Sequence, residues 1–416
     1  STLRTFLWHT FIHASMNSSM FSERSALASW DPFLAFVDHW EEKTKSFRSD
    51  GDLCFGQPQE KPLAALTETM GRVIGAPQDS DTFAYRVKIA EVQEAIVRNL
   101  QQSRGLTVDA EDVFTTNGAL SALTLTMTIL ANPGEAAVLV SPIYFVYRQQ
   151  LELMGIEPVV VPTTQDFDLD VAAIRRAITD STRFILINSP NNPSGKIYSM
   201  ETLQKLTDML NEVNEGRPDR PIFVISDEAY NRIVFDGIDF HSITEIYPYT
   251  IMIYTWAKTL LCPGERFGYI ALPHIMPREV RTRLRDIITR CQIAGWSKPN
   301  NTTALTYMHA ERDGMRTDLT VLQRRRDKLH LCLTAQGWTV FKPSGTFYML
   351  VEVDKTMFLS AEDFVDALAA ERVLVMPGFI MEIKDHVRMS LTANDAMVDF
   401  AIKAFAKLRK KEAPAA

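Results

Sequence analysis

A lysine and an arginine lie close together in the stretch YTWAKTLLCPGERFGYI, which covers residues 254–270. Lys258 has apolar neighbours, and Pro263-Gly264 predicts a turn between it and Arg266. Two cations so close to apolar strands indicate chemistry, because an unpaired buried charge destabilises a fold. A lysine amine can form a Schiff base with an aldehyde and then transfer protons, and a guanidinium can bind phosphate through two parallel hydrogen bonds. We therefore interpret Lys258 as the covalent anchor of a cofactor and Arg266 as its phosphate clamp.

An acidic residue ends another apolar run, in ISDEAYNRIVFDG at residues 225–237. The carboxylate of Asp227 needs a partner if it is buried, since an isolated buried charge is costly. A protonated pyridine nitrogen would be such a partner, and keeping that nitrogen protonated makes a cofactor ring an electron sink. Tyr230 follows in the same motif and is placed to reach a hydroxyl group on the ring. The structural alternative is that Asp227 only caps a helix.

The predicted phosphate site draws on two other places in the chain. TTNGALSAL, at residues 115–123, is typical of a turn that opens a helix. Gly118 permits close approach of the backbone, and the N–H groups of Ala119 and Leu120 would meet an anion at the helix N-terminus. Thr255, at the end of a strand, adds a hydroxyl donor. Taken alone the helix N-terminus is weak support, since many helices begin in this way.

A rigid turn follows a third apolar run, in SPNNPSGKIY at residues 189–198. Two prolines and a glycine exclude regular structure there and hold Asn192 in a fixed position. Its side-chain amide would then point where the backbone directs it. The alternative is a tight turn without a ligand.

Apolar, β-branched runs alternate along the chain with segments of helical periodicity. The runs predicted as strands are AVLVS (137–141), PVVVP (158–162), FILINS (184–189), IFVISD (222–227), IMIYT (251–255) and GYIAL (268–272). The segments predicted as helices include residues 117–130, 169–178 and 200–213. This alternation predicts an α/β fold, with a mostly parallel sheet covered by helices on both faces. The last two runs lack a helix between them, which predicts one antiparallel edge.

Three of the predicted strands finish in polar residues. These are Asn188-Ser189, Ser226-Asp227 and Thr255. In open α/β sheets, ligands bind outside the carboxyl ends of the strands. We therefore expect these polar groups to meet in one crevice, although any single strand can end in a turn-forming residue for structural reasons alone.

The chain is long enough for two domains. Residues 1–15, rich in hydroxyl groups and poor in acids, are predicted to be a disordered leader, and residues 16–65 to pack with a small domain. Residues 66–297 would form the large cofactor-binding domain, and residues 298–416 a smaller α+β domain. We expect a cytoplasmic protein, with import into an organelle through the leader as the alternative.

The composition excludes several classes of partner. The formal net charge is −7, from 44 Lys+Arg against 51 Asp+Glu, so no excess of cations is available for nucleic acid. No apolar run is long enough for a transmembrane helix, so we expect no membrane partner. The four cysteines are scattered and lack metal-ligand spacing to histidine, which argues against a metal site. They are Cys54, Cys262, Cys291 and Cys332.

The order of these motifs resembles that of fold-type I pyridoxal-phosphate enzymes, and more narrowly class I/II aminotransferases. The motifs are the turn with NGALSA, then SPIY, NNPSG, SDEAY and WAKT followed by PGERFGY. The resemblance covers roughly residues 50 to 410. It implies a large domain with a mostly parallel, seven-stranded type of sheet and a smaller α+β domain. It also implies a homodimer whose active sites are shared between subunits.

The resemblance implies a role for each matched residue. Lys258 would carry pyridoxal 5'-phosphate as a Schiff base, Asp227 would pair with the pyridine nitrogen, and Tyr230 and Asn192 would contact the ring hydroxyl. The residues that would hold the phosphate are Gly118, Ala119, Leu120, Thr255 and Arg266.

Four further residues would face the ring or the substrate. Tyr144, in SPIYFVY, would stack on the ring, and Arg388, in HVRMSLT, would grip the substrate α-carboxylate as a bidentate fork. Gly56, in LCFGQP, would line the substrate pocket together with Asn192. Trp296 is placed at the mouth of this pocket, where an aromatic wall would suit apolar side chains; its alternative is ordinary packing.

The segment FAYRVKIAEVQEAI, residues 83–96, departs from the family pattern. Lys88 stands where the family has a glycine, and Val92-Gln93 replaces a Leu-Arg pair. The aromatic residue that the family donates to the neighbouring subunit would be Phe83 or Tyr85, and we favour Tyr85. These changes leave the substrate class open.

The resemblance predicts an aminotransferase that moves an amino group from an L-amino acid to a 2-oxo acid through the Lys258 Schiff base. The alternative within the family is another reaction of the same carbanion, such as elimination, cyclisation or oxidation. A rival of a different class is a non-catalytic relative that serves as an interaction module. A nicotinamide enzyme is disfavoured because no GxGxxG follows an early strand.

Overall fold

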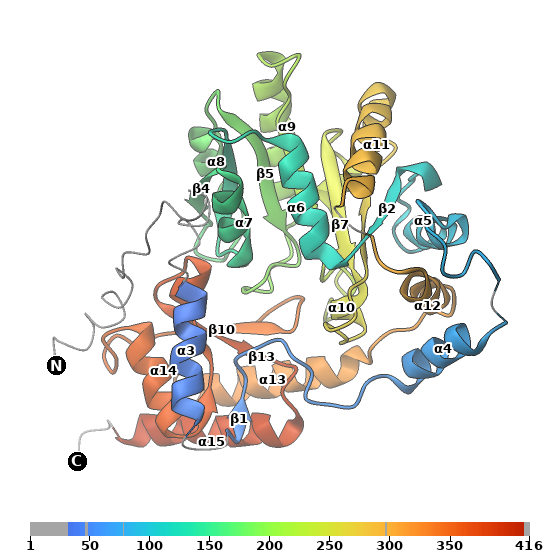
Figure 1. Ribbon diagram of the computed structural model, residues 1–416. Coiled ribbons are helices and arrows are strands. Elements are labelled where there is room, and N and C mark those ends of the chain that lie inside the picture. The colour runs from blue at the N-terminus through green and yellow to red at the C-terminus, as the bar shows by residue number, and fades with distance from the viewer. Residues whose placement is uncertain (1–31, 46–48, 78, 296–297, 412–416) are drawn as a thin grey trace, which may run out of the picture.

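We describe the protein from a computed structural model, which covers residues 32–45, 49–77, 79–295 and 298–411 (Figure 1). The leader predicted at residues 1–15 lies outside this part of the chain. The α-helices are α3 (Pro32–Thr44), α4 (Ala64–Gly75), α5 (Ala90–Arg104), α6 (Gly118–Leu130), α7 (Val146–Met154), α8 (Val171–Ala177), α9 (Met200–Glu215), α10 (Trp256–Thr259), α11 (Arg278–Ile293), α12 (Asn301–Arg312), α13 (Leu319–Ala335), α14 (Ala361–Ala370) and α15 (Asp395–Lys411). Short 3-10 helices are η2 (Ala110–Asp112), η3 (Ile243–Glu245) and η4 (Gly378–Met381). The strands are β1 (Gly51–Asp52), β2 (Val113–Thr116), β3 (Ala136–Ser141), β4 (Glu157–Pro162), β5 (Thr182–Asn188), β6 (Phe223–Asp227), β7 (Thr250–Thr255), β8 (Gly268–Ala271), β9 (Val340–Phe341), β10 (Tyr348–Glu352), β11 (Val373–Leu374), β12 (Met376–Pro377) and β13 (His386–Ser390).

The largest sheet has seven strands in the order β2-β8-β7-β6-β5-β3-β4. The neighbours from β7 to β4 are parallel, whereas β8 is antiparallel to both β7 and β2. The predicted α/β class with a mostly parallel sheet is therefore confirmed. The predicted antiparallel arrangement at one edge is confirmed, since the last two runs pair antiparallel, although β8 lies one strand inside the edge. The edge strand β2 is a short run, and its last residues were interpreted as part of the helix-opening turn.

Alternate residues of the central strands face opposite sides of this sheet, as strand geometry requires. On β3, Leu139 packs with α6 and α7 on one face, and Val138 packs with α8 and α9 on the other. Both residues are fully buried. Burial on both faces explains why the strands read as continuous apolar runs rather than alternating ones. Figure 1 shows α6 and α7 in front of these strands and α9 behind them.

A second, four-stranded sheet is antiparallel, in the order β12-β13-β10-β9. β1 pairs separately with β11 in parallel, at Gly51 with Val373. In Figure 1 these strands lie below the large sheet, with α3, α13, α14 and α15 around them. Phe36 of α3 and Leu53 share their core with Trp338 and Phe405. The N-terminal segment is thus held by the C-terminal part of the chain.

The division of the chain into two domains remains our proposal, and the packing of α12 changes where we draw it. We predicted a boundary at residue 297, before α12. In the structure α12 packs against α4 and α5, and its Tyr307 stacks on Phe267 with 4.9 Å between the ring centres. The apolar side of α12 is buried beside Trp256, next to the large sheet. We therefore propose that the large domain extends through α12.

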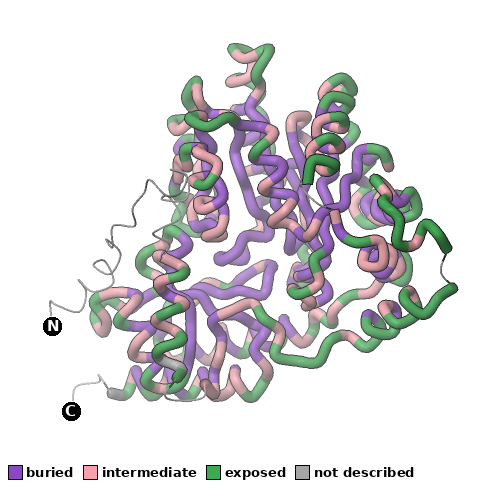
Figure 2. Tube along the Cα trace, viewed as in Figure 1, coloured by how far each residue is buried: buried purple, intermediate pink, exposed green. Residues whose placement is uncertain are grey.

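Exposure divides the chain clearly. Figure 2 shows the buried chain passing through the strands of both sheets, whereas the chain from α4 to the start of α5 is exposed along most of its length.

Within the described residues, no helix combines the length and the apolar character needed to cross a bilayer.

Candidate active site

A pocket lies at the carboxyl ends of β5, β6 and β7. Asn188, Asp227 and Thr255, the last residues of these strands, all line it, as the strand-end pattern predicted. Lys258 and Arg266 line it as well. About 530 Å³ of empty space lies in the pocket and its mouth.

Lys258 projects into this pocket from a short helix that begins where β7 ends. Thr255 caps α10 by accepting a hydrogen bond from the Ala257 N–H at 3.3 Å, which turns the chain from strand to helix. The Lys258 amine is half-buried and lies 6.0 Å from the ring centre of Tyr230 and 5.8 Å from that of Phe347. Among the described residues it has no acidic partner within ion-pair distance. The amine is thus available as a nucleophile or a base.

Asp227 is buried at the end of β6, with 5% of its surface exposed. Its carboxylate accepts hydrogen bonds from the Tyr147 hydroxyl at 2.6 Å and from the Ala229 N–H at 3.1 Å. Burial raises the pKa of this carboxyl, while the hydrogen bond from Tyr147, that from Ala229 and the charge of Lys258 lower it. No arginine or lysine of the described chain pairs with it. A cation inside the pocket would complete its environment.

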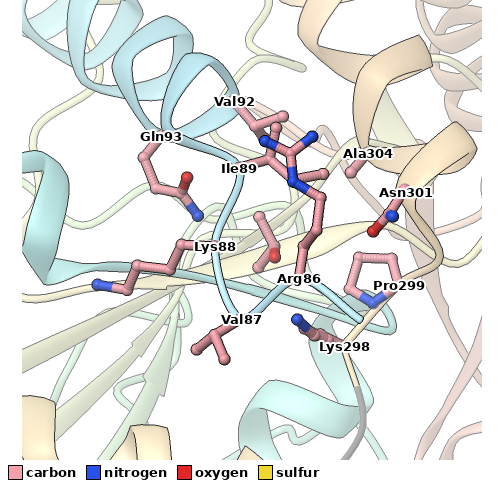
Figure 3. Close-up of a pocket in the computed structure, with 11 residues that line it drawn as sticks. Arg86, Val87, Lys88, Ile89, Val92, Gln93, Lys298, Pro299, Asn301 and Ala304 are labelled. Atoms are coloured by element: carbon pink, nitrogen blue, oxygen red, sulfur yellow. The ribbon is translucent and has the colours of Figure 1, made fainter. Parts of the chain in front are cut away.

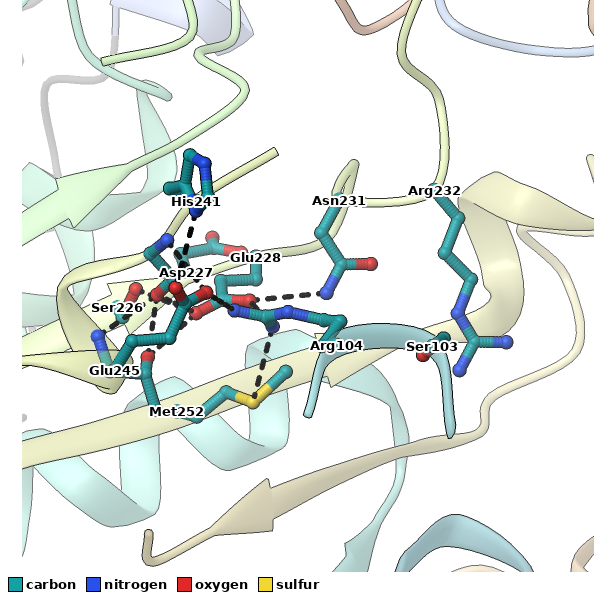
Figure 4. Close-up of polar contacts among 12 residues, drawn as sticks. Ser103, Arg104, Ser226, Asp227, Glu228, Asn231, Arg232, His241, Glu245 and Met252 are labelled. Atoms are coloured by element: carbon teal, nitrogen blue, oxygen red, sulfur yellow. Dashed lines mark hydrogen bonds and ion pairs between the residues drawn. The ribbon is translucent and has the colours of Figure 1, made fainter. Parts of the chain in front are cut away.

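The next residue, Glu228, shows how this fold satisfies an acid that has only a structural role. Its side chain points away from the pocket and is completely buried. Arg104 donates to it at 2.5 Å (Figure 4). The hydroxyls of Ser242 and Thr244 donate to it at 2.5 and 2.7 Å. Asp227 receives no such cation from the described residues. The contrast between these consecutive acids disfavours the interpretation of Asp227 as a structural cap alone.

Two glycines allow an arginine to close the other end of the pocket. Gly118 has a positive φ of 75°, and a Cβ there would lie 2.7 Å from a terminal nitrogen of Arg266. A Cβ at Gly268 would lie 2.5 Å from the Tyr254 carbonyl oxygen and 3.0 Å from Gly118. Arg266 donates to the Pro263 carbonyl at 2.9 Å, which orients its guanidinium. The guanidinium and the N-terminus of α6 therefore form a cradle that a side chain at either glycine would obstruct.

Thr255 differs from the expected arrangement. Its hydroxyl donates to the Phe267 carbonyl at 2.8 Å, so its proton is already used within the protein. We predicted this hydroxyl as a donor to a phosphate. In the observed conformation it instead fixes the turn between β7 and β8, close to the cradle.

Arg388, on β13, brings a cation from the second sheet to Asn192, which lines the pocket. It is 2% exposed and lies 4.1 Å above the ring centre of Tyr348. Its terminal nitrogens donate to the Cys54 carbonyl at 3.0 Å and to the Asn192 side-chain oxygen at 3.2 Å. Within the described chain its Nε has no hydrogen-bond partner, and no carboxylate pairs with it. A buried guanidinium without an anion fits a ligand carboxylate.

Comparison with known proteins agrees with this donor set. The family described as "Aminotransferase class I and II" matches residues 49–405. The chain belongs to the class I and II aminotransferases. The resemblance inferred from the sequence motifs is therefore confirmed, and with it the enzymatic class of the chain.

Several aminotransferases are similar over most of their length. A probable aspartate/prephenate aminotransferase of Thermus aquaticus is 28% identical over 85% of this chain and 90% of its own. Aromatic-amino-acid aminotransferase 2 of Thermococcus litoralis is 25% identical over 79% of this chain and 84% of its own. A crystal structure of an amino transferase from Eubacterium rectale matches with a TM-score of 0.83 and 26% identity, covering 97% of this chain and 99% of that one.

The aminotransferase pocket fits the chemistry of pyridoxal phosphate, the cofactor of the family. The cradle of Gly118 and Arg266 fits a phosphate, because it is cationic and a Cβ would block it. Asp227 fits a protonated ring nitrogen, because it is buried and lacks a cation among the described residues. The Lys258 amine lines the same pocket as Asp227 and Arg266, and no described acid pairs with it.

The remaining site residues that we predicted from the sequence lie in different parts of the structure. Among them, Ala119, Leu120, Tyr144, Asn192 and Tyr230 line the pocket. Gly56 lies beside it, against Tyr348, where a Cβ would overlap the tyrosine hydroxyl. Phe83 and Tyr85 are exposed and away from this pocket, and Trp296 lies outside the described residues. The roles assigned to all of these remain predictions.

Tyr147 is a pocket residue that sequence reasoning missed. It lies three residues after Tyr144 in SPIYFVY, its N–H donates to the Tyr144 carbonyl at 3.0 Å, and the two rings meet edge to face with their centres 5.5 Å apart. Its hydroxyl holds the Asp227 carboxylate, and it is 2% exposed. The available signal was a second tyrosine three residues after Tyr144, at the turn that leads into α7.

Replacing Arg388 with lysine is expected to raise KM for the amino acid by about 10- to 100-fold, with a smaller effect on kcat. A lysine lacks the planar fork that can hold a carboxylate while the other donors bond Cys54 and Asn192. Steady-state kinetics with one amino donor measures this change. Arg278→Lys, at an exposed arginine of α11, is the matched control. An unchanged KM in the Arg388 variant would contradict the assignment.

Proposed function

We propose that this aminotransferase binds pyridoxal 5'-phosphate at Lys258 and moves an amino group between an L-amino acid and a 2-oxo acid. One observation carries the proposal. Two buried charged groups lack partners of opposite charge among the described residues: Asp227, which lines the pocket with the Lys258 amine, and Arg388, which contacts the pocket residue Asn192. A cationic ring nitrogen and a substrate carboxylate are the two partners that they would take.

The cofactor, when bound, supplies an aldehyde that condenses with amino groups and a ring that takes up electrons from the substrate. Arg266, Gly118 and the first N–H groups of α6 would hold its phosphate. Asp227 would keep a proton on the ring nitrogen, and Tyr147 would keep the carboxylate of Asp227 in place. Tyr230 and Asn192 would contact the ring hydroxyl, and Tyr144 would stack on the ring.

Two residues would act on the substrate. Arg388 would bind the α-carboxylate and thereby orient the Cα–H bond toward Lys258. The Lys258 amine would remove the α-proton and later return a proton, which is general base and general acid catalysis by one group. The same steps in reverse would aminate the 2-oxo acid, so that one amino group passes from the first substrate to the second.

We infer a homodimer with shared active sites. Phe83 and Tyr85 support it, because both aromatic rings are exposed, at 78% and 108%. Large exposed aromatic side chains favour a protein partner. We still favour Tyr85 as the residue that reaches the neighbouring site. Light scattering at working concentration would reveal a monomer if this inference is wrong.

The relatives suggest where to search for the substrate. Their names include aspartate, prephenate and aromatic amino acids as substrates. A Thermus thermophilus aspartate aminotransferase mutant with 25% identity, and a TM-score of 0.82 over 93% of this chain and 99% of that one, was solved in complex with tryptophan. The described lining of the pocket holds Leu120, Leu123 and several aromatic rings. Its two cations, Lys258 and Arg266, are assigned to the cofactor and leave no cation in the lining for a substrate side chain. We therefore propose that apolar or aromatic amino acids are preferred.

A spectroscopic screen tests the function. Purified protein loaded with the cofactor is expected to be yellow, and productive amino acids should bleach or shift the absorbance band. A 2-oxo acid added afterwards should restore it, which separates transamination from elimination or cyclisation. Aspartate, leucine, phenylalanine and tyrosine should be compared at equal concentration. A protein that stays colourless after soaking in the cofactor would overturn the proposal.

A further inference from the structure

The helix that carries Lys258 is too short to hold its own position. α10 has only four residues, which is about one helical turn. A single turn is unstable by itself in water, because it fixes several backbone angles for very few hydrogen bonds. Contacts with neighbouring elements must therefore set where the Lys258 amine points.

These contacts hold α10 on both sides of the lysine. Before Lys258, Trp256 is 1% exposed, and its indole Nε1 donates to the Glu311 carboxylate at 2.5 Å. After Lys258, the hydroxyls of Thr259 and Tyr254 hydrogen-bond each other at 2.8 Å, and both residues are buried. The short helix is thus tied to α12 through one neighbour of the lysine and to β7 through another.

The carboxylate of Glu311 also fixes the turn that carries Tyr230. Arg232 lies two residues after Tyr230, and its terminal nitrogens donate to the two Glu311 oxygens at 3.0 and 2.9 Å. The side chain of Arg232 is 16% exposed and that of Glu311 is 1% exposed. The guanidinium also lies 4.6 Å from the ring centre of Tyr254. Glu311 therefore links the turn after β6 with the helix after β7.

α12, which carries Glu311 near its C-terminal end, is itself held at its other end. There the side-chain amide of Asn301 donates to the carbonyls of Thr82 at 2.9 Å and Ala84 at 3.0 Å. Figure 3 shows Asn301 and Ala304 of α12 beside the segment that leads into α5. Since α12 also packs along α4 and α5, the Glu311 carboxylate is presented from a supported element.

The buried pair of Glu311 and Arg232 contributes geometry more than stability. The cost of taking two charges out of water largely offsets their attraction, so a buried ion pair is weak evidence for stability. Two parallel hydrogen bonds, however, fix both the distance and the orientation of the partners. The bond from Trp256 brings the lysine helix into the same arrangement.

Glu311 reaches the active site only through these partners. It is absent from the described lining of the pocket, whereas Lys258 and Tyr230 both belong to it. The Lys258 amine lies 6.0 Å from the Tyr230 ring centre, and without the shared carboxylate that separation would vary. Such variation matters, because a misplacement of about 1 Å can slow catalysis by about 100-fold.

We propose that Glu311 is a positioning residue for transamination. Through Trp256 it places the Lys258 amine. Through Arg232 it places the turn of Tyr230. The inference rests on the proposed function, in which Lys258 removes and returns the substrate proton, and it adds the residue that sets where this amine stands.

Steady-state kinetics of Trp256→Phe and Glu311→Gln tests the proposal. Phenylalanine keeps an aromatic ring in the core but cannot donate to Glu311, and glutamine keeps the shape of the side chain but loses its charge. We expect each variant to lower kcat by about 10- to 100-fold. KM for the amino donor should stay within about twofold, because Arg388 on β13 is left unchanged.

Asp112→Asn is the matched control for the loss of a buried ion pair. Asp112 is completely buried, and Arg281 donates to it at 2.6 Å. It lies just before β2, whereas the other end of that strand leads to Gly118 and the cofactor phosphate cradle. Asp112→Asn and Glu311→Gln should both lower Tm, but only Glu311→Gln should lower kcat.

Chemical labelling of the cofactor-free protein gives a readout that does not depend on the reaction. Acetic anhydride modifies accessible amines, and mass spectrometry measures the rate at each lysine. In Trp256→Phe and Glu311→Gln, Lys258 should react faster than in the wild type by about threefold or more, because a helix that loses its anchor opens locally. Lys205, exposed on α9, should react at the wild-type rate in both variants. Lys258 should also keep that rate in Asp112→Asn.

Wild-type kcat in both Trp256→Phe and Glu311→Gln would overturn the inference, and so would an equal fall of kcat in Asp112→Asn. If Glu311→Gln does not fold, Trp256→Phe decides, since it leaves the ion pair of Glu311 and Arg232 in place. A wild type without transamination would overturn the proposed function and this inference with it. An active wild type with equally active variants would overturn this inference alone.

Discussion

Lys258→Ala is expected to abolish transamination, with kcat/KM falling by at least about 10⁴-fold. The reason is that the described lining of the pocket offers no other amine, and its other cation, Arg266, is a guanidinium, which does not serve as a base. The variant should still fold and bind the cofactor, because its phosphate and ring contacts come from other residues. A coupled assay with the best amino donor measures the loss.

Borohydride treatment gives a second readout of the same variant. Reduction should fix the cofactor covalently to the wild-type chain and leave the Lys258→Ala chain unmodified by mass spectrometry. Lys205→Ala, on the exposed face of α9, is the control and should be labelled like the wild type. Covalent labelling of Lys258→Ala at an equal level would place the attachment at another lysine and refute the assignment.

Asp227→Asn is expected to lower kcat/KM by about 10²- to 10³-fold, the size typical for removal of one electrostatic stabiliser. An amide has nearly the same shape as the carboxylate but no charge, so it cannot keep the ring nitrogen protonated. KM should change less than kcat, because Arg388 still binds the substrate carboxylate. Single-turnover loss of the cofactor band with an amino acid measures the slowed proton transfer.

In the absence of the cofactor, Asp227→Asn should stabilise the folded protein, although it lowers the activity of the loaded enzyme. Burial raises the pKa of Asp227 in the folded protein. Between the unfolded pKa, about 3.9, and this raised value, the folded state binds more protons than the unfolded state. Stability therefore falls as pH rises through that window. An uncharged amide at this position removes this loss of stability. The Tm of the Asp227→Asn variant should therefore rise above that of the wild type as the pH increases toward neutrality.

Glu228→Gln is the matched control for this stability measurement. Glu228 is also buried but is paired with Arg104, so removing its charge leaves that arginine without its closest charged partner. Thermal unfolding of the cofactor-free proteins, followed across a pH series, should show Tm raised by Asp227→Asn and lowered by Glu228→Gln near neutral pH. Destabilisation by both would mean that Asp227 serves as an ordinary structural acid.

Local sequence chemistry was sufficient for much of the fold. The apolar runs that became β3, β5 and β6 could be recognised because they are buried on both faces and carry no alternation. The strand β2 was missed, since four residues ending in two threonines look the same as a turn. The position of α12 was also misjudged, because its apolar face gives no indication of which sheet it will cover.

The motif order by itself determined the enzyme family, and the polar strand ends predicted that Asn188, Asp227 and Thr255 would meet, because parallel strands deliver their carboxyl ends to one edge of a sheet. What only the tertiary structure decided was which charges remain without partners. Asp227 and Glu228 are neighbours in sequence, but they point to opposite sides of β6, and Arg104 satisfies just one of them. Arg388 likewise reaches Asn192 across 196 positions of sequence. Whether a buried charge finds a partner depends on how distant elements pack, and no local pattern records that.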